Sequence, residues 1–292
     1  MYKRIIAVAT ILSLNVSVWA DYPSDRKAAM ELVKAGKNEE ALAAFDKMAK
    51  GTAVEAQKSD ALEQAALCSN RLKKYDQAIE LAGQIPSVPM AKSVKIQLML
   101  ENRKYEEIIA AFKDEDMSNW PEKAAGPAYF CRGRAYITVR DGKAAETDLK
   151  KAVETLGEGE LKDQARLLLG ETYRDILNDD AQALAAFTEG TKAQALYGWI
   201  CMTCITSAAD ILAKQKKCEE ALSMLGKVDS SKMTGVWKYN FILAYANVAA
   251  AQGKKDEAIV KLNEALAAKD IADWQKSAFQ KKLKELQETE TK

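Results

Sequence analysis

Two cysteines three residues apart form the feature of this sequence that comes nearest to a reactive site. Cys201-Met202-Thr203-Cys204 has the Cys-x-x-Cys spacing of redox couples and of half a metal site. The motif lies inside the helical pattern GWICMTCITSAADIL, whereas a thioredoxin-like couple lies where a strand turns into a helix. A structural zinc site needs four ligands, and only Cys218 could join this pair without recruiting carboxylates. We expect packing residues or an incidental disulfide here, with a thiol-based redox or metal-binding function as an alternative.

Other residue types that carry out chemistry are absent or suit a structural role. The chain contains no histidine, which excludes Ser-His-Asp and Cys-His nucleophiles, a histidine base and imidazole metal sites. Paired carboxylates such as Glu39-Glu40 and Glu106-Glu107 lie at expected helix starts, where acidic residues suit the helix dipole. Cys68 and Cys131 fall within expected helices as small apolar residues. Gly157-Glu158-Gly159 lacks the spacing of a phosphate-binding loop. We therefore predict a protein that is not an enzyme and has no cofactor and no metal site.

The first twenty residues, MYKRIIAVATILSLNVSVWA, have the pattern of a secretory signal peptide. Lys3 and Arg4 precede an apolar run, and small residues stand at the third and first places before a cut after Ala20. The apolar run contains Asn15 and is shorter than the roughly 20 residues of a spanning helix. We expect an exported protein, periplasmic or secreted, with no stable membrane span after cleavage.

The charge of the mature chain argues against nucleic-acid binding. The whole sequence has 43 basic and 42 acidic residues, and removal of Lys3 and Arg4 with the signal peptide leaves 41 against 42. A general nucleic-acid binder needs a basic surplus to displace counterions from phosphates. We therefore expect a protein or peptide partner and no nucleic acid.

The elements that would position a site come from a repeat. Seven segments, each a polar turn followed by a short amphipathic helix such as GKKDEAIVKLNEAL, recur along the chain. Their aligned anchor positions are Ala41, Ala78, Ile108, Ala145, Ala183, Ala221 and Ala258, with steps of 37, 30, 37, 38, 38 and 37 residues. Another small residue stands 12 or 13 residues earlier in six units: Ala29, Ala66, Gly133, Gly170, Ala209 and Ala246. Such a period favours an all-α solenoid, in which helices too short to be stable alone share a core with their neighbours.

The pattern resembles the tetratricopeptide repeat over nearly all of the mature chain. Leu169-Gly170-Glu171-Thr172-Tyr173 is similar to the first-helix signature of that family, and Gly133-Arg134-Ala135-Tyr136 has its glycine and tyrosine. The small–aromatic–small triplet of the second helix occurs as Ala41, Phe45 and Met48. Most steps exceed the family's period of about 34 residues by roughly one helical turn. The resemblance implies a right-handed α-solenoid of about seven helix pairs, followed by a C-terminal capping helix.

The repeat phase predicts one domain after the signal peptide, over residues 21–292. An eighth second helix would need an anchor beyond the end of the chain, so the last first helix, 272–288, is expected to be an unpaired cap. The predicted helix pairs span roughly 24–50, 54–85, 90–115, 121–156, 161–192, 198–228 and 235–268.

The resemblance also implies where a partner would bind. First helices of such solenoids line a concave groove, and the family's groove positions correspond to Arg134, Glu171, Arg174, Asn240 and Asn247 in this chain. In some members an asparagine equivalent to Asn247 works with lysines and an arginine to hold a peptide's terminal carboxylate. The companion lysines are not in place here by sequence alignment, so this specificity is not carried over. We expect a non-catalytic scaffold that binds a protein or peptide, in an unknown oligomeric state.

Tryptophans in phase with the repeat raise a further alternative. Trp199, Trp237 and Trp274 are spaced by 38 and 37 residues. Tryptophans in register with a repeat are expected to pack between helices. If they were exposed instead, a solenoid that binds carbohydrate or a cell-wall strand would be the alternative.

Overall fold

The computed structural model describes residues 22–193, 198–229, 232–233, 235–268 and 270–288, and the predicted signal peptide, 1–20, lies outside these ranges. The described residues form helices and turns without strands, which confirms the predicted all-α fold. No helix in these ranges combines the length and the hydropathy needed to cross a bilayer. The chain divides into two compact units, Met1–Val139 (unit 1) and Arg140–Lys292 (unit 2). The division falls inside the helix pair predicted for 121–156.

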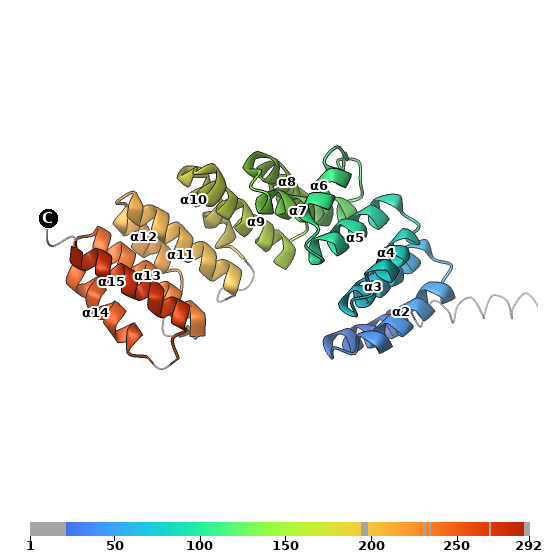
Figure 1. The fold of residues 1–292 in the computed structure, drawn as a ribbon, viewed down its shortest axis with the longest axis horizontal. Coiled ribbons are helices and arrows are strands. Elements are labelled where there is room, and N and C mark those ends of the chain that lie inside the picture. Colours follow the sequence, from blue (N-terminus) through green and yellow to red (C-terminus); the bar gives the residue numbers. More distant parts are fainter. Residues whose placement is uncertain (1–21, 194–197, 230–231, 234, 269, 289–292) are drawn as a thin grey trace, which may run out of the picture. The chain divides into compact units, whose positions relative to one another are not determined.

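Unit 1 consists of helices that follow one another in short hairpins (Figure 1). A helix over residues 22–34 is followed by α2 (Asn38–Gly51), α3 (Glu55–Arg71), α4 (Tyr75–Gly83), α5 (Val88–Glu101), α6 (Tyr105–Phe112) and α7 (Glu122–Thr138). Each helix from α3 to α5 packs against the next one in sequence, and α5 also packs against α7. The short helices α4 and α6 are therefore supported by the longer helices on either side.

Unit 2 continues the same alternation and ends on the predicted single helix. Its elements are α8 (Gly142–Thr155), α9 (Glu160–Thr172), the π-helix η1 (Tyr173–Leu177), α10 (Asp180–Gly190), α11 (Trp199–Lys214), α12 (Cys218–Leu225), α13 (Gly235–Ala251), α14 (Lys255–Leu266) and α15 (Asp273–Glu288). The first helix α11 contacts its own partner α12 and the next first helix α13, and α15 contacts both α13 and α14. The paired, sequential packing of a repeat protein is thus present.

The repeat positions form the core of both units. All seven anchor residues, from Ala41 to Ala258, have 0% of their surface exposed. In the fifth repeat a Cβ atom on Gly170 would lie 2.6 Å from two ring carbons of Phe187, which is itself fully buried. The missing side chain of Gly170 therefore allows α9 to approach α10 closely enough for the ring to fit between them.

The first helices of the seven repeats end at equivalent positions. A residue in the left-handed conformation stands five positions before each anchor: Gly36, Lys73, Arg103, Arg140, Asn178, Lys216 and Gly253. After Lys73, for example, the Lys74 N–H donates to Ser69 O at 3.0 Å, and the Lys73 N–H donates to Asn70 O at 2.8 Å. This is the Schellman arrangement, which satisfies the last carbonyl groups of a helix. Five of the seven turns adopt this strained backbone without glycine.

Exchanging glycine and lysine at these turns should change stability in opposite directions. Lys216→Gly is expected to raise the free energy of unfolding of unit 2 by about 0.5–1 kcal/mol, because relief of left-handed strain exceeds the added freedom of the unfolded chain. Gly253→Ala should lower it by about 1 kcal/mol. Urea unfolding followed by circular dichroism measures both variants. Equal shifts in the same direction would contradict this account.

Candidate functional site

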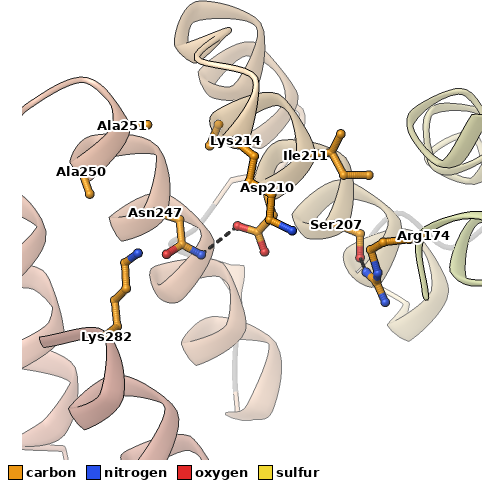
Figure 2. A pocket seen from close by; sticks show the side chains of 10 residues that line it. Arg174, Ser207, Asp210, Ile211, Lys214, Asn247, Ala250, Ala251 and Lys282 are labelled. Atoms are coloured by element: carbon orange, nitrogen blue, oxygen red, sulfur yellow. Dashed lines mark hydrogen bonds between the residues drawn. The ribbon is translucent and has the colours of Figure 1, made fainter. Parts of the chain in front are cut away.

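Unit 2 contains a polar cavity of about 520 Å³, which we call the unit 2 pocket (Figure 2). Four elements contribute to it: η1, α11, α13 and α15. Its polar lining consists of Arg174, Ser207, Asp210, Lys214, Asn247 and Lys282, and its apolar walls consist of Ile211, Ala213, Ala250 and Ala251. The pocket is therefore shared by the first helices of successive repeats.

The phase of the repeat explains why these side chains meet. Asp210 and Asn247 each stand one residue after the small residue of their first helix, Ala209 and Ala246. In the same way Ala213 and Ala250 stand four residues after it, as Arg174 does after Gly170. Positions separated by three or four residues share one helix face. One face of each first helix therefore lines the pocket.

Arg174 is the most firmly held cation of the pocket. Its Nε and Nη2 donate to the two carboxylate oxygens of Asp175 at 2.7 and 2.8 Å, and its Nη1 donates to Ser207 Oγ at 2.9 Å. The guanidinium carbon also lies 5.3 Å from the ring centroid of Phe187. Because a guanidinium has about five N–H groups and three are used here, two remain for a ligand.

The π-helix that carries Arg174 reflects one inserted residue. Gly170 and Asn178 are eight positions apart, whereas the small residue and the left-handed residue of the next repeat, Ala209 and Lys216, are seven apart. The closing hydrogen bond of this turn accordingly runs from the Asp179 N–H to Tyr173 O, six residues back. A π-turn is a usual way to accommodate one extra residue, and such turns are frequent at functional sites.

Contacts with α8 hold η1 in place. The Tyr173 hydroxyl is in a buried side chain and donates to Glu146 Oε1 at 2.9 Å. Lys150, whose Nζ lies 2.8 Å from the same oxygen, together with Lys143 and Tyr173, lowers the pKa of Glu146 to about 2. Glu146 is therefore ionised at any ordinary pH and remains an acceptor for the tyrosine.

Asp210 is a largely buried carboxylate within the pocket. It accepts a hydrogen bond from Asn247 Nδ2 at 2.9 Å, which joins α11 to α13 (Figure 2). Burial raises the pKa of Asp210 above its usual value, and the Asn247 bond and the charges of Lys214, Lys282 and Arg174 oppose that rise. Asp210 is the one acidic residue in the lining of the pocket.

Two lysines give the pocket a positive surplus. Lys282 extends toward Asn247 and also lies 3.5 Å from Glu285, whereas Lys214 forms no ion pair with any residue that the structure describes. Both line the cavity together with Arg174. Lysines at the family's companion positions are still absent beside Asn247, and the pocket instead receives Lys214 and Lys282 from other helices and other repeat positions.

The structure brings only two of the five predicted groove residues into this pocket, Arg174 and Asn247. Arg134 is exposed in unit 1, where its guanidinium lies 5.6 Å from the centroid of Phe130. Glu171 does not line the pocket, and burial raises the pKa of its carboxyl group. Asn240 accepts a hydrogen bond from Gln275 Nε2 at 3.3 Å. Within unit 2, Glu171 interacts electrostatically with Arg174, but neither Glu171 nor Asn240 lines the pocket.

Unit 1 has a pocket of similar size and opposite charge. Its volume is about 490 Å³, and it lies among α3, α5 and α7. Its lining includes three carboxylates, Glu55, Asp60 and Glu63, and one cation, Lys123. Asp60 is held by Arg26, whose Nε lies 2.6 Å from it. An anion would be repelled here, so this unit 1 pocket serves as an internal comparison for the unit 2 pocket.

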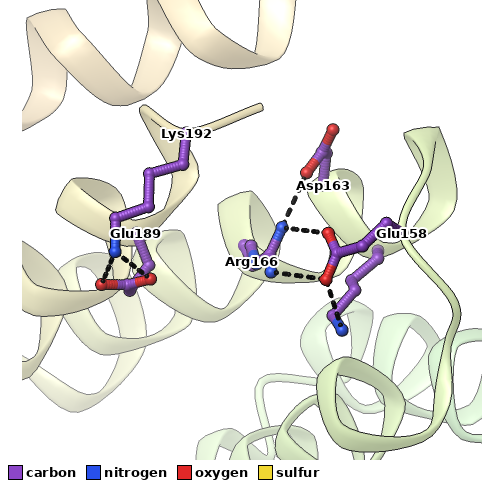
Figure 3. Close-up of polar contacts among 6 residues, drawn as sticks. Glu158, Asp163, Arg166, Glu189 and Lys192 are labelled. Carbon is purple, nitrogen blue, oxygen red and sulfur yellow. Dashed lines mark hydrogen bonds and ion pairs between the residues drawn. The ribbon is translucent and has the colours of Figure 1, made fainter. Parts of the chain in front are cut away.

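Several basic residues elsewhere in unit 2 are paired with acidic neighbours. At the start of α9, Glu158 accepts from Arg166 at 3.3 and 3.4 Å and pairs with Lys162 at 2.9 Å, while Arg166 also binds Asp163 at 2.9 Å (Figure 3). Lys192 is paired with Glu189 at 2.7 Å in the same view. These cations are already neutralised, in contrast to Lys214.

The cysteines are packed as apolar residues. Cys201 and Cys204 are buried, and Cys201 Sγ donates to Thr191 O at 3.4 Å. Burial raises the pKa of both thiols, that of Cys204 to about 12. A side chain on Gly190 would collide with Cys204 Sγ, so this thiol fills the space that the glycine leaves. Among the described residues no group of three or more His, Cys, Asp or Glu side chains is arranged to hold a metal ion.

Thiol titration should separate the one accessible cysteine from the rest. Cys68, Cys131, Cys201 and Cys204 are buried with raised pKa values, whereas Cys218 is half-buried at the start of α12. In the folded protein we expect fast reaction with an aromatic disulfide at Cys218 alone, because the thiolate is the reactive form. The Cys218→Ser variant should then show no fast phase. A fast phase from Cys201 and Cys204 would revive the redox alternative.

The tryptophans are more exposed than expected. Trp199 and Trp274 are 44% and 58% exposed at the first turns of α11 and α15. Trp237 is partly buried and packs against the core of unit 2. The expectation that all three pack between helices is therefore wrong for two of them, which lie in the first turns of their helices and are exposed.

Comparison with solved structures finds tetratricopeptide repeat proteins among the matches. No protein-family model matches the sequence, and no curated protein matches it. A tetratricopeptide repeat protein from Parabacteroides merdae aligns with 92% of this chain and 99% of its own, at 16% identity and a TM-score of 0.45. The tetratricopeptide repeat domain of P58(IPK) aligns with 93% of this chain and 99% of its own, at 14% identity and a TM-score of 0.28.

Proposed function

We propose that this chain is an exported, non-catalytic scaffold, periplasmic or secreted, that binds an acidic segment of a protein partner in the unit 2 pocket. The observation that carries the proposal is the lining of that pocket, in which Lys214 has no ion-pair partner among the described residues and Arg174 keeps free N–H groups beyond its pair with Asp175, against the single lining carboxylate of Asp210. Two sequence features support the other parts of the proposal. The signal-peptide pattern of residues 1–20 supports export, and the absence of histidine supports a non-catalytic role.

The size and walls of the pocket suit a short segment of polypeptide. A volume of about 520 Å³ lies within the range of sites that hold small ligands, roughly 300–1,000 Å³. Ala250, Ala251 and Ile211 provide apolar walls, while Asn247 and the free N–H groups of Arg174 supply directed donors. Lys214, which forms no ion pair with a described residue, adds a cation that a carboxylate would neutralise. Fixed donors and a positive surplus favour an anionic side chain over a neutral one.

Affinity capture from the native cell envelope tests this function. The mature chain is compared with the variant Arg174→Ala, Lys214→Ala, Lys282→Ala, and with a control in which Lys192, Lys261 and Lys284 of unit 2 are replaced by alanine. The control removes equal charge from exposed positions outside the pocket, where ion pairs contribute little stability. We expect the pocket variant to lose the captured partner and the control to retain it. Identical captured proteins from all three chains would show that the pocket does not bind the captured partner.

Exposure of Trp199 and Trp274 favours glycan binding as a second candidate function. An exposed indole offers an apolar face on which a sugar ring stacks. Titration with soluble cell-wall fragments should then shift the indole fluorescence, and Trp274→Ala should reduce the shift. Unchanged fluorescence at saturating glycan would end this candidate.

A further inference from the structure

Asp210 is the pocket residue whose charge opposes the proposed ligand. Its carboxylate lines the cavity and accepts one hydrogen bond among the described residues, from Asn247 Nδ2 at 2.9 Å. A carboxylate offers about four lone-pair sites, so Asp210 keeps acceptor capacity beyond the Asn247 bond. An acidic ligand that enters the cavity would therefore meet a second carboxylate beside it.

Each element that lines the pocket around Asp210 contributes an identified polar or charged side chain. Lys214 lies on the same helix, α11, Arg174 comes from η1 and Lys282 comes from α15. Helix α13 contributes one polar side chain to the lining among the described residues, the neutral amide of Asn247. Burial nevertheless raises the pKa of Asp210, against the effects of the Asn247 bond and these three cations. Compared with water, the empty pocket thus already favours the ionised carboxylate of Asp210 less.

We propose that the unit 2 pocket takes up one proton from solvent, at the Asp210 carboxylate, when an acidic segment binds. The inference rests on the proposed function and adds the way in which pH controls that site. A bound carboxylate repels ionised Asp210 and displaces water from it, and both effects favour the protonated form. Once neutral, Asp210 has an O–H group that can donate to the ligand.

Linkage fixes the direction of the pH dependence. The complex holds more protons than the free protein wherever the pKa of Asp210 in the complex exceeds that in the empty pocket. Affinity therefore increases as pH falls through the pKa of the complex, and the gain is complete below the pKa of the empty pocket. For one linked proton the slope is at most about tenfold per pH unit. Arg174 lowers the pKa of Asp175, so that neighbouring carboxylate remains ionised throughout.

Calorimetric titration with acetyl-tetraglutamate amide tests the proposal on the mature chain. Measurements between about pH 5.5 and about pH 8 keep this probe ionised, because glutamate has a pKa near 4.3. Two buffers with different ionisation enthalpies give the number of protons taken up. We expect tighter binding at the lower pH with proton uptake by the native chain, and no uptake by Asp210→Asn, which should bind more tightly than the native chain at the higher pH.

Glu63→Gln is the matched control. Burial raises the pKa of the Glu63 carboxyl group too, but this residue belongs to unit 1 and lines the other pocket. This variant should keep the proton uptake of the native chain. Uptake that persists in Asp210→Asn, or binding by the native chain without pH dependence, would overturn the inference and leave the proposed function intact. Failure of both chains to bind the probe at any pH would overturn both.

Discussion

Replacing Phe187 with alanine is expected to lower the free energy of unfolding of unit 2 by about 3–5 kcal/mol. The ring is fully buried in the core of that unit, fits against Gly170 and lies 5.3 Å beneath the guanidinium carbon of Arg174. Its removal leaves a cavity and deprives the pocket's arginine of a contact. Urea unfolding monitored by circular dichroism measures the loss.

Gly170 provides the control for this prediction. Gly170→Ala alone should be destabilising by about 1–2 kcal/mol, because its Cβ would overlap the Phe187 ring and overpacking outweighs the gain in helix propensity. In the Phe187→Ala background the same change should be neutral or favourable, since the ring is gone. Gly83→Ala, which meets no atom within 4 Å, should not be destabilising in either background. Equal costs of Gly170→Ala with and without the ring would contradict the proposed packing.

Replacing Arg132 with methionine should destabilise unit 1 by about 2–4 kcal/mol. Arg132 is 8% exposed, and its Nη1 donates to the carbonyl oxygens of Phe112 and Glu115. Phe112 is the last residue of the short helix α6, where a cation also suits the helix dipole. Without the guanidinium these carbonyls lose their charged donor. Thermal and urea unfolding of the variant measure the cost.

Arg134 offers a matched comparison on the same helix. It is exposed, so Arg134→Met should change stability by no more than about 0.5 kcal/mol. Arg132→Lys should fall between the two, because one ammonium cannot reproduce the spread of a guanidinium over two acceptors. Indistinguishable stabilities of the Arg132→Met and Arg134→Met variants would show that α6 does not depend on the buried arginine.

The fold was predictable because burial repeats at a fixed interval. The seven anchors share one chemical requirement, a side chain that fits between packed helices, and all are fully buried. The turns were less visible, because Lys73, Arg103 and Lys216 adopt a left-handed conformation that glycine would normally reveal. In the sequence, the only sign of the π-turn is the spacing of 13 residues between Gly170 and Ala183, where five other repeats have 12.

The pocket was predictable only in part. Asn247 and Arg174 were found because the groove positions of the resembling family fall on them. Asp210 was missed although it stands one residue after Ala209, at the same repeat position as Asn247, so the phase alone could have found it. Lys282 could not be found in that way, since no second helix follows α15 among the described residues to fix its register. Charge balance in a pocket depends on such side chains from neighbouring helices.

Site-specific photocrosslinking tests the central claim most directly. A benzophenone amino acid is placed at Ala251, an exposed residue that lines the unit 2 pocket, and in a second chain at Ala56, an exposed residue that lines the acidic unit 1 pocket. In the native envelope we expect a partner peptide rich in Asp and Glu to crosslink at Ala251 and not at Ala56. Equal labelling at both positions, or crosslinked peptides without acidic residues, would contradict the claim that the unit 2 pocket binds an acidic segment.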